Sequence, residues 1–313
     1  MRLPNWRRGG ALGVGVLAAA LTLVVVRYAT ARYERALAER SAATIAAYLS
    51  IAAPADQSGS DYDLAQLLVQ ARALAALLGS SHVEVFHGTA PLVQAVAPPL
   101  QPAQLDRLRR EETTEWNGAA ALAPLLDREG WAVVGGVRVL RSPLAVRWLN
   151  WGLPVVLLIS IAFAVSGARA TGEVRRQRRA LRAYAAAAMV AGCVAYADVR
   201  IVAKRATDRW LAETGALVQE ATTHAAGRLE TPAIASIVRG GTLAPAGIAG
   251  WDSKPHRLSR GAVAAIVVRI GAGRWAELRT APAEAATGLW LLCTLGLALL
   301  GPAALWIAAT RER

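Results

Sequence analysis

The sequence predicts an α-helical membrane protein with four transmembrane helices and two extracytoplasmic α+β domains on long stalk helices. Three observations lead to this prediction: an excess of hydrophobic residues, their concentration in four segments, and basic residues beside the ends of those segments. Hydrophobic residues make up 55% of the 313 residues, whereas a soluble domain has about 45–50%. This composition excludes intrinsic disorder and a collagen-like fibre, and two cysteines are too few for a disulfide framework.

Four apolar segments are the candidate membrane crossings, and they span residues 11–28, 148–167, 183–203 and 285–309. A bilayer core of about 30 Å requires roughly 20 helical residues, which the second and fourth segments provide and the first reaches with its flanks. The third is rich in alanine, and Asp198 and Arg200 interrupt it near one end. Its small residues have the spacing that lets helices approach closely. We therefore expect a helix that its neighbours hold in place.

The first segment has two interpretations. Arg2, Arg7 and Arg8 before an apolar run are typical of a secretory signal peptide. However, Arg27 and Tyr28 follow the run directly, without a small-x-small cleavage pattern. We therefore expect a retained membrane anchor.

Basic residues predict the orientation, because Lys and Arg near membrane ends remain on the cytoplasmic side. The tip 1–10, the loop 168–182 and the tail 310–313 are rich in arginine. Four crossings place all three in the cytoplasm and place 29–147 and 204–284 on the outer side. The chain is therefore expected to be a multi-pass membrane protein with both termini in the cytoplasm and two extracytoplasmic domains.

The loop is also expected to contact anionic membrane lipid. The basic residues that would do so are Arg175, Arg176, Arg178, Arg179 and Arg182. A nucleic-acid partner is not expected, because no basic stripe with interleaved aromatic residues is present.

Tryptophans near the ends of the apolar segments are predicted to anchor the helices at the membrane interface, where indole is half buried and its N–H is hydrated. They are Trp6, Trp148, Trp151, Trp290 and Trp306. Cys193 and Cys293 lie inside apolar segments without a neighbouring base or ligand, so neither a redox nor a metal role is expected.

The two outer regions share one pattern. Each begins with a helix continuing from a membrane segment, passes through turns rich in Pro and Gly, and closes with an apolar strand. The closing strands are expected at 131–140 and 262–270. In the first region we also expect helices at 64–78 and 102–115 and a strand at 82–86. A duplication is a hypothesis based on this pattern alone.

The first outer region, 29–144, resembles the extracytoplasmic Cache- or PAS-like sensor region of bacterial membrane receptors, which include sensor histidine kinases and chemoreceptors. Residues 82–88, followed by Thr89-Ala-Pro-Leu, are similar to the strand-and-turn start of such a domain, and 130–140 to its last strand. The resemblance is architectural and carries no ligand-binding motif. It implies a location in the bacterial inner membrane, with the two outer domains in the periplasm. The cytoplasmic segments are too short for the output domain of such receptors, so any signal is expected to pass through a membrane partner.

The sequence shows no Walker, Rossmann or kinase motif, so we expect a non-enzymatic protein without a cofactor. His82 and Glu84, two apart on a strand, point the same way, and His87 follows. Metal sites need three or four ligands at defined spacing, so an exposed strand face is favoured over a metal site. The candidate ligand-binding residues are His82, Glu84, Phe86, His87, Trp116 and Arg138.

Two functions remain open. In the first, the chain is a sensor- or receptor-like subunit whose outer domains bind a small ligand or a protein and signal through a membrane partner or a second copy. In the second, it is a structural or accessory subunit of a larger energy-transducing or transport complex. A sensor should have a pocket of a few hundred Å³ with convergent polar groups, whereas an accessory subunit should have an exposed apolar patch.

Overall fold

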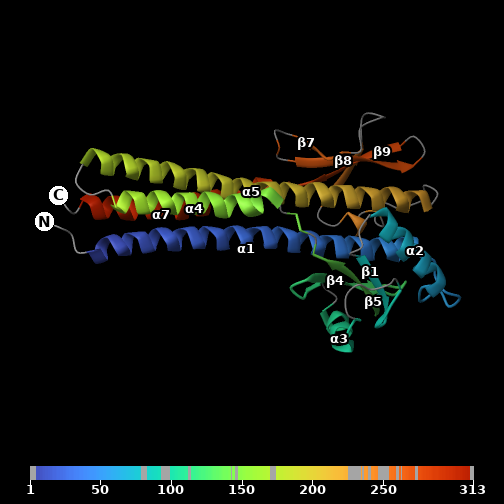
Figure 1. Ribbon diagram of the computed structural model, residues 1–313. Coiled ribbons are helices and arrows are strands. Elements are labelled where there is room, and N and C mark those ends of the chain that lie inside the picture. Colours follow the sequence, from blue (N-terminus) through green and yellow to red (C-terminus); the bar gives the residue numbers. More distant parts are fainter. Residues whose placement is uncertain are drawn as a thin grey trace. The chain divides into compact units, whose positions relative to one another are not determined.

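The computed structural model of the chain is mostly helical, with two small sheets among the residues it describes (Figure 1). The described residues are 5–78, 83–92, 99–111, 114–141, 143–144, 147–169, 174–224, 234, 236–238, 241–245, 254–258, 261, 263–271 and 274–310. The chain divides into two compact units. The first, the membrane unit, contains Met1–Tyr33, Leu144–Lys204 and Ala283–Arg313; the second, the sheet unit, contains Glu34–Pro143 and Arg205–Pro282.

The membrane unit is built from parts of α1 (Asn5–Ala52) and α5 (Val174–His224) together with α4 (Arg147–Arg169) and α7 (Gly288–Thr310). Among the described residues, α1, α5 and α7 are long and apolar enough to cross a membrane. Helix α4 contributes a shorter apolar stretch, Trp151–Ser166. These helices identify the chain as a membrane protein, since helices with about 20 apolar residues satisfy all their backbone hydrogen bonds inside lipid.

Small residues bring the helices of the membrane unit close together. Ala191 and Ala195 of α5 are fully buried, which confirms that neighbouring helices enclose this alanine-rich segment. Tyr184 of α5 is also buried, and a Cβ added at Gly301 of α7 would lie 2.0 Å from its hydroxyl oxygen. A larger residue at position 301 would require the tyrosine side chain to shift.

The first sheet of the sheet unit has five antiparallel strands in the order β2-β1-β5-β4-β3. The strands are β1 (Val83–His87), β2 (Ala90–Pro91), β3 (Glu115–Trp116), β4 (Ala120–Leu126) and β5 (Val133–Leu140). Helices α2 (Leu64–Leu77) and α3 (Pro102–Glu111) accompany them. Asp63 caps α2, because its carboxylate accepts hydrogen bonds from the amides of Ala65 and Gln66.

The expected helices and strands of this region are present, but some of their ends differ. Helix α3 ends at Glu111 instead of residue 115, and the last strand begins at Val133 instead of Trp131. The short strands β2 and β3 were not predicted, and neither was β4, a central strand. Its sequence, Ala-Ala-Leu-Ala-Pro-Leu-Leu, does not alternate, because most of its side chains on both faces are buried.

The second sheet has four antiparallel strands in the order β6-β9-β8-β7. They are β6 (Thr242–Pro245), β7 (His256–Leu258), β8 (Val263–Gly271) and β9 (Arg274–Thr280). Helix α5 packs on one face, where a Cβ at Gly215 would lie 2.9 Å from Val268. The expectation that strand 262–270 closes this region is wrong, since β9 follows it. Burial does alternate along β9, with Ala276, Leu278 and Thr280 buried between Glu277 and Arg279, but this pattern was not recognised in the sequence.

The two sheets have the same connectivity. In the first, β1 pairs with β5, β5 with β4, and β4 with β3; in the second, β6 pairs with β9, β9 with β8, and β8 with β7. The last strands also carry an arginine at the same distance from the next long helix. Arg147, where α4 begins, is nine positions after Arg138, and Gly288, where α7 begins, is nine after Arg279. The counterpart of β5 is therefore β9.

Candidate functional site

Three of the predicted ligand-binding residues form one cluster in the first sheet. Glu84 on β1 and Arg138 on β5 are directly opposite each other, with Arg138 Nε 2.9 Å from Glu84 Oε2. The Arg138 guanidinium carbon lies 4.5 Å from the centre of the Phe86 ring, a distance typical of a cation–π contact. The side chains of Glu84 and Arg138 are only 2% and 6% exposed.

This cluster is part of the core, not an exposed strand face. Phe86 packs with Leu105 and Leu108 of α3 in a buried apolar cluster. The expectation that Glu84 lies on an exposed face is therefore wrong, because α3 covers that face of β1. This ion pair links β1 to β5, and its burial leaves a ligand little access.

The remaining predicted residues lie elsewhere. Trp116 is on β3, where the Arg35 guanidinium of α1 lies 5.8 Å from its ring centre. His87 ends β1 on the face opposite to Glu84 and Phe86. His82 lies outside the described residues. Of the other predicted residues, Glu84, Phe86 and Arg138 lie together, whereas Trp116 and His87 lie apart from them.

His87 lines an open groove of about 600 Å³ at one end of β1 and β5, which we call the His87 groove. Its volume is within the range of about 300–1,000 Å³ that is typical of small-molecule sites. The lining residues are Asp61, His87, Gly88, Arg109, Trp131, Ala132, Val133 and Val134. They come from the loop before α2, from the turn after β1, from α3, and from the β4–β5 turn together with the start of β5.

Asp61 connects the loop before α2 to β1. Its Oδ2 is 3.3 Å from His87 Nε2, and its Oδ1 accepts a hydrogen bond from the Tyr62 amide at 2.7 Å. The loop itself is closed by a bond from the Asp56 amide to the Asp61 carbonyl oxygen, 2.8 Å long. Asp61 was not among the predicted site residues, because in the sequence it is only one acidic residue beside a segment of turn-forming residues.

The opposite wall of the groove is a rigid turn. The Asp127 carboxylate accepts hydrogen bonds from the amides of Trp131 and Ala132, at 2.7 and 3.1 Å. Gly130 has a φ of +77°, a conformation that favours glycine. The indole of Trp131 is 80% exposed beside this turn. Across from it, Arg109 Nε donates to the Val133 carbonyl oxygen at 3.4 Å.

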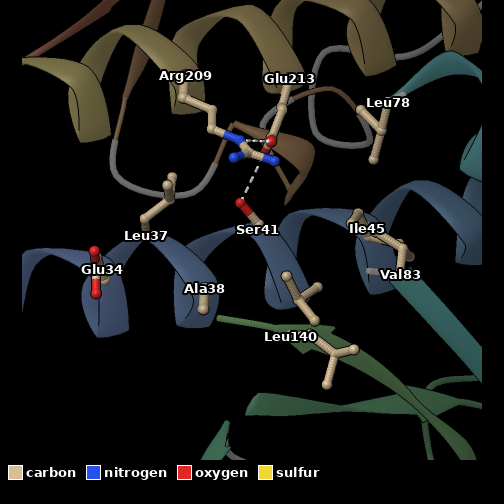
Figure 2. A pocket seen from close by; sticks show the side chains of 11 residues that line it. Glu34, Leu37, Ala38, Ser41, Ile45, Leu78, Val83, Leu140, Arg209 and Glu213 are labelled. Atoms are coloured by element: carbon tan, nitrogen blue, oxygen red, sulfur yellow. Dashed lines mark hydrogen bonds and ion pairs between the residues drawn. The ribbon is translucent and has the colours of Figure 1, made fainter. Parts of the chain in front are cut away.

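A second, smaller space lies where the stalk parts of α1 and α5 meet the first sheet, and we call it the stalk cavity (Figure 2). Its volume is about 20 Å³, enough for about one water molecule. Ser41 of α1 donates a 2.7 Å hydrogen bond to Glu213 of α5, and Arg209 Nε lies 2.7 Å from the same carboxylate. The cavity is too small for a ligand, and the Ser41–Glu213 hydrogen bond joins α1 to α5.

Strands β1 and β5 connect the two spaces. His87 and Val133 lie at the groove, whereas Val83, Val139 and Leu140, at the opposite ends of the same strands, line the stalk cavity. Glu34 of α1 also lines the cavity and forms an ion pair with Arg141, one residue after β5. Strands β1 and β5 therefore extend from the groove to the cavity beside α1 and α5.

The predicted membrane-facing residues lie on the long helices. Trp151 is 78% and Trp306 is 52% exposed, and Trp290 lies 6.2 Å from the Tyr28 ring. Trp6 and Trp148 belong to α1 and α4, with side chains outside the described part of the structure. Exposure of indole on the membrane unit is compatible with interfacial anchoring.

The predicted basic loop is shorter than expected, because α5 begins at Val174. Arg178, Arg179 and Arg182 are exposed on its first turns. Arg175 and Arg176 belong to the same helix, but their side chains are not among the described ones.

Tyr62 is the buried support of the loop that carries Asp61. It is 2% exposed, and its hydroxyl donates to the Leu126 carbonyl oxygen at 2.7 Å. Burial raises the pKa of Tyr62 to about 12 from the usual 10.0. The folded protein therefore retains a proton that the unfolded chain loses above pH 10, and stability falls as pH rises from 10 to 12.

We expect the Tyr62→Phe variant to be about 1 kcal/mol less stable than the parent at pH 8, through loss of this hydrogen bond. Between pH 9 and 12 the parent should lose about 2 kcal/mol that the variant does not lose. Urea denaturation at pH 8, 10 and 11.5 measures the difference, which should shrink and then reverse. Parallel pH profiles for the two proteins would contradict the assignment.

Within the described residues, no group of three or more His, Cys, Asp and Glu side chains is placed to hold a metal ion. Cys193 is exposed and Cys293 is partly buried, and the two are free thiols. The His87 groove is therefore the best candidate site. Comparisons of the chain with protein-family models, with curated proteins and with solved structures found no match.

Proposed function

We propose that the protein is a non-enzymatic, sensor-like subunit of the bacterial inner membrane that binds a small ligand in the His87 groove. The observation that carries this proposal is the groove itself, which has ligand-sized volume and convergent polar and aromatic side chains. Binding acts on the stalk helices α1 and α5, and a membrane partner or second copy of the chain receives the signal.

The order of elements supports the resemblance to Cache- or PAS-like sensor regions. A stalk helix leads into an antiparallel sheet, α3 covers one face of that sheet, and an apolar helix follows the last strand. The second sheet repeats the pairing scheme of β1, β5, β4 and β3. We therefore propose that the two halves are copies of one module.

The repeated order of strands, followed in each half by an apolar helix, supports four membrane crossings. Helix α7 follows β9 as α4 follows β5, and α7 has the length and hydropathy of a membrane span. By this equivalence α4 is the fourth span, and both sheets lie outside the cytoplasm. Reporter fusions after Glu173 and after His256 should report opposite compartments. If both fusions report the cytoplasm, α5 does not cross and this topology is wrong.

The signal follows from the geometry of β1 and β5. A ligand that contacts His87 and Val133 shifts the groove ends of these strands, and their other ends pack at the stalk cavity. There the Ser41–Glu213 hydrogen bond joins α1 to α5. A small displacement of the strands thereby biases the packing of two helices that enter the membrane unit.

Ligand binding can be tested by a thermal-shift screen of the full chain in detergent. At least one compound should raise the melting temperature of the parent but not of a Trp131→Ala variant. Arg110→Gln is the matched control, because Arg110 lies on α3 beside Arg109 and does not line the groove. If no compound stabilises the parent, the sensor proposal fails.

One observation favours the alternative, an accessory subunit of a larger membrane complex. Helix α2 exposes three large apolar side chains, Leu64, Val69 and Leu77, and such residues often mark protein-binding surfaces. A fixed partner that co-purifies with the parent but not with Val69→Glu, combined with a negative ligand screen, would establish this alternative.

A further inference from the structure

The polar side chains of the His87 groove differ in whether hydrogen bonds within the protein already occupy them. Both carboxylate oxygens of Asp61 are used, Oδ1 by the Tyr62 amide and Oδ2 by His87. Asp127 is similarly engaged by two backbone amides of its turn. The acidic side chains around the groove are therefore occupied in holding its walls.

Arg109 is in the opposite situation. Its side chain is 53% exposed, and its partner Asp106 is 59% exposed at 3.5 Å. Exposed pairs of this kind contribute little and exchange readily with water or ligand. The Val133 carbonyl oxygen accepts a hydrogen bond from Arg109 Nε, which orients the guanidinium at the groove. Arg109 is thus an oriented cation available to an anion, and guanidinium binds carboxylates in a two-pronged geometry.

Trp131 provides a flat apolar face beside this cation. Its indole is 80% exposed, although its backbone is held by Asp127. A large aromatic side chain on a rigid turn binds ring compounds with little loss of conformational freedom.

We propose that the His87 groove binds an aromatic carboxylate, with the carboxylate on Arg109 and the ring against Trp131. This inference rests on the proposed sensor function and specifies its ligand class. A cationic ring compound is disfavoured, because the Asp61 and Asp127 carboxylates are engaged and Arg109 repels it.

The test is isothermal titration calorimetry on the full chain in nanodiscs, with phenylacetate as the probe. Acetate supplies the charge without the ring, and benzylamine supplies the ring with the opposite charge. Phenylacetate should bind at least tenfold more tightly than either. Arg109→Gln should weaken phenylacetate binding about tenfold or more, as loss of a charged hydrogen bond does.

Variants at Trp131 separate the ring contact from folding. Trp131→Ala should weaken binding about tenfold, Trp131→Phe should restore most of it, and Arg110→Gln should change it less than twofold. Equal binding of benzylamine, or an effect of Arg110→Gln equal to that of Arg109→Gln, overturns the inference.

Failure of this inference is distinguishable from failure of the sensor proposal. If other compounds from the screen bind in a Trp131-dependent manner and phenylacetate does not, the ligand class is wrong and the sensor proposal stands. If no compound binds at all, both are overturned.

Discussion

Removing one partner of the Glu84–Arg138 pair is expected to destabilise the sheet unit by about 3–5 kcal/mol. Both side chains are almost fully buried, and Arg138 lies over the Phe86 ring. Glu84→Leu leaves a buried guanidinium without its counter-ion, and Arg138→Met leaves a buried carboxylate. Urea denaturation of each variant, followed by tryptophan fluorescence, measures the loss.

The double variant Glu84→Leu/Arg138→Met should recover most of this stability, since a buried ion pair can be replaced by apolar residues at little cost. The matched control is Glu39→Gln at the Arg35–Glu39 pair, where Arg35 Nε is 2.7 Å from Glu39 Oε1 and the side chains are 53% and 31% exposed. This control substitution should lower the free energy of unfolding by less than about 0.5 kcal/mol. A double variant as unstable as either single one would show that the two side chains act independently.

Gly135→Ala is expected to cause the second largest loss of folding stability. A Cβ at this position would lie 2.0 Å from the Phe86 carbonyl oxygen and 2.9 Å from its carbon. These are backbone atoms of β1, directly paired with β5, so they cannot move without opening the ladder. Overpacking usually costs about 1–3 kcal/mol, and we expect at least the upper value here.

Gly136→Ala is the neighbouring control. Its Cβ would lie 3.1 Å from a methyl carbon of Leu122 and 3.3 Å from the Ala123 carbonyl oxygen, so a shift of a few tenths of an ångström relieves most of the contact. Thermal unfolding should show a much lower melting temperature for Gly135→Ala than for Gly136→Ala. Similar melting temperatures would contradict the close approach of β1 and β5.

Local patterns predicted the elements that depend on local chemistry. Helix α2 follows Asp63, a capping residue, with apolar residues at helical spacing, and β1 lies where alternation was recognised. Strand β4 was not predicted, since its alanines and Pro124 show no strand periodicity. It is stabilised by β5, a partner that follows the next turn, and its own residues do not indicate the pairing.

The candidate site was only partly predictable for the same reason. Glu84 and Arg138 are 54 positions apart in the chain, and their contact depends on the register of β1 against β5. His87 was identified, but its neighbour Asp61 comes from a loop that precedes α2. Trp131 was expected within a strand, whereas it belongs to the turn that holds one wall of the groove. Tertiary contacts, absent from any local pattern, bring these residues together.

The shared connectivity of the two sheets has a consequence for biosynthesis. In each half the earliest long strand pairs with the final one, β1 with β5 and β6 with β9. Neither sheet can be completed until the ribosome has synthesised the residues just before α4 or α7, and such long-range pairing is slow to form. Each sheet therefore remains incomplete until the residues just before α4 or α7 have been synthesised, so sheet closure is a late step in the folding of each half.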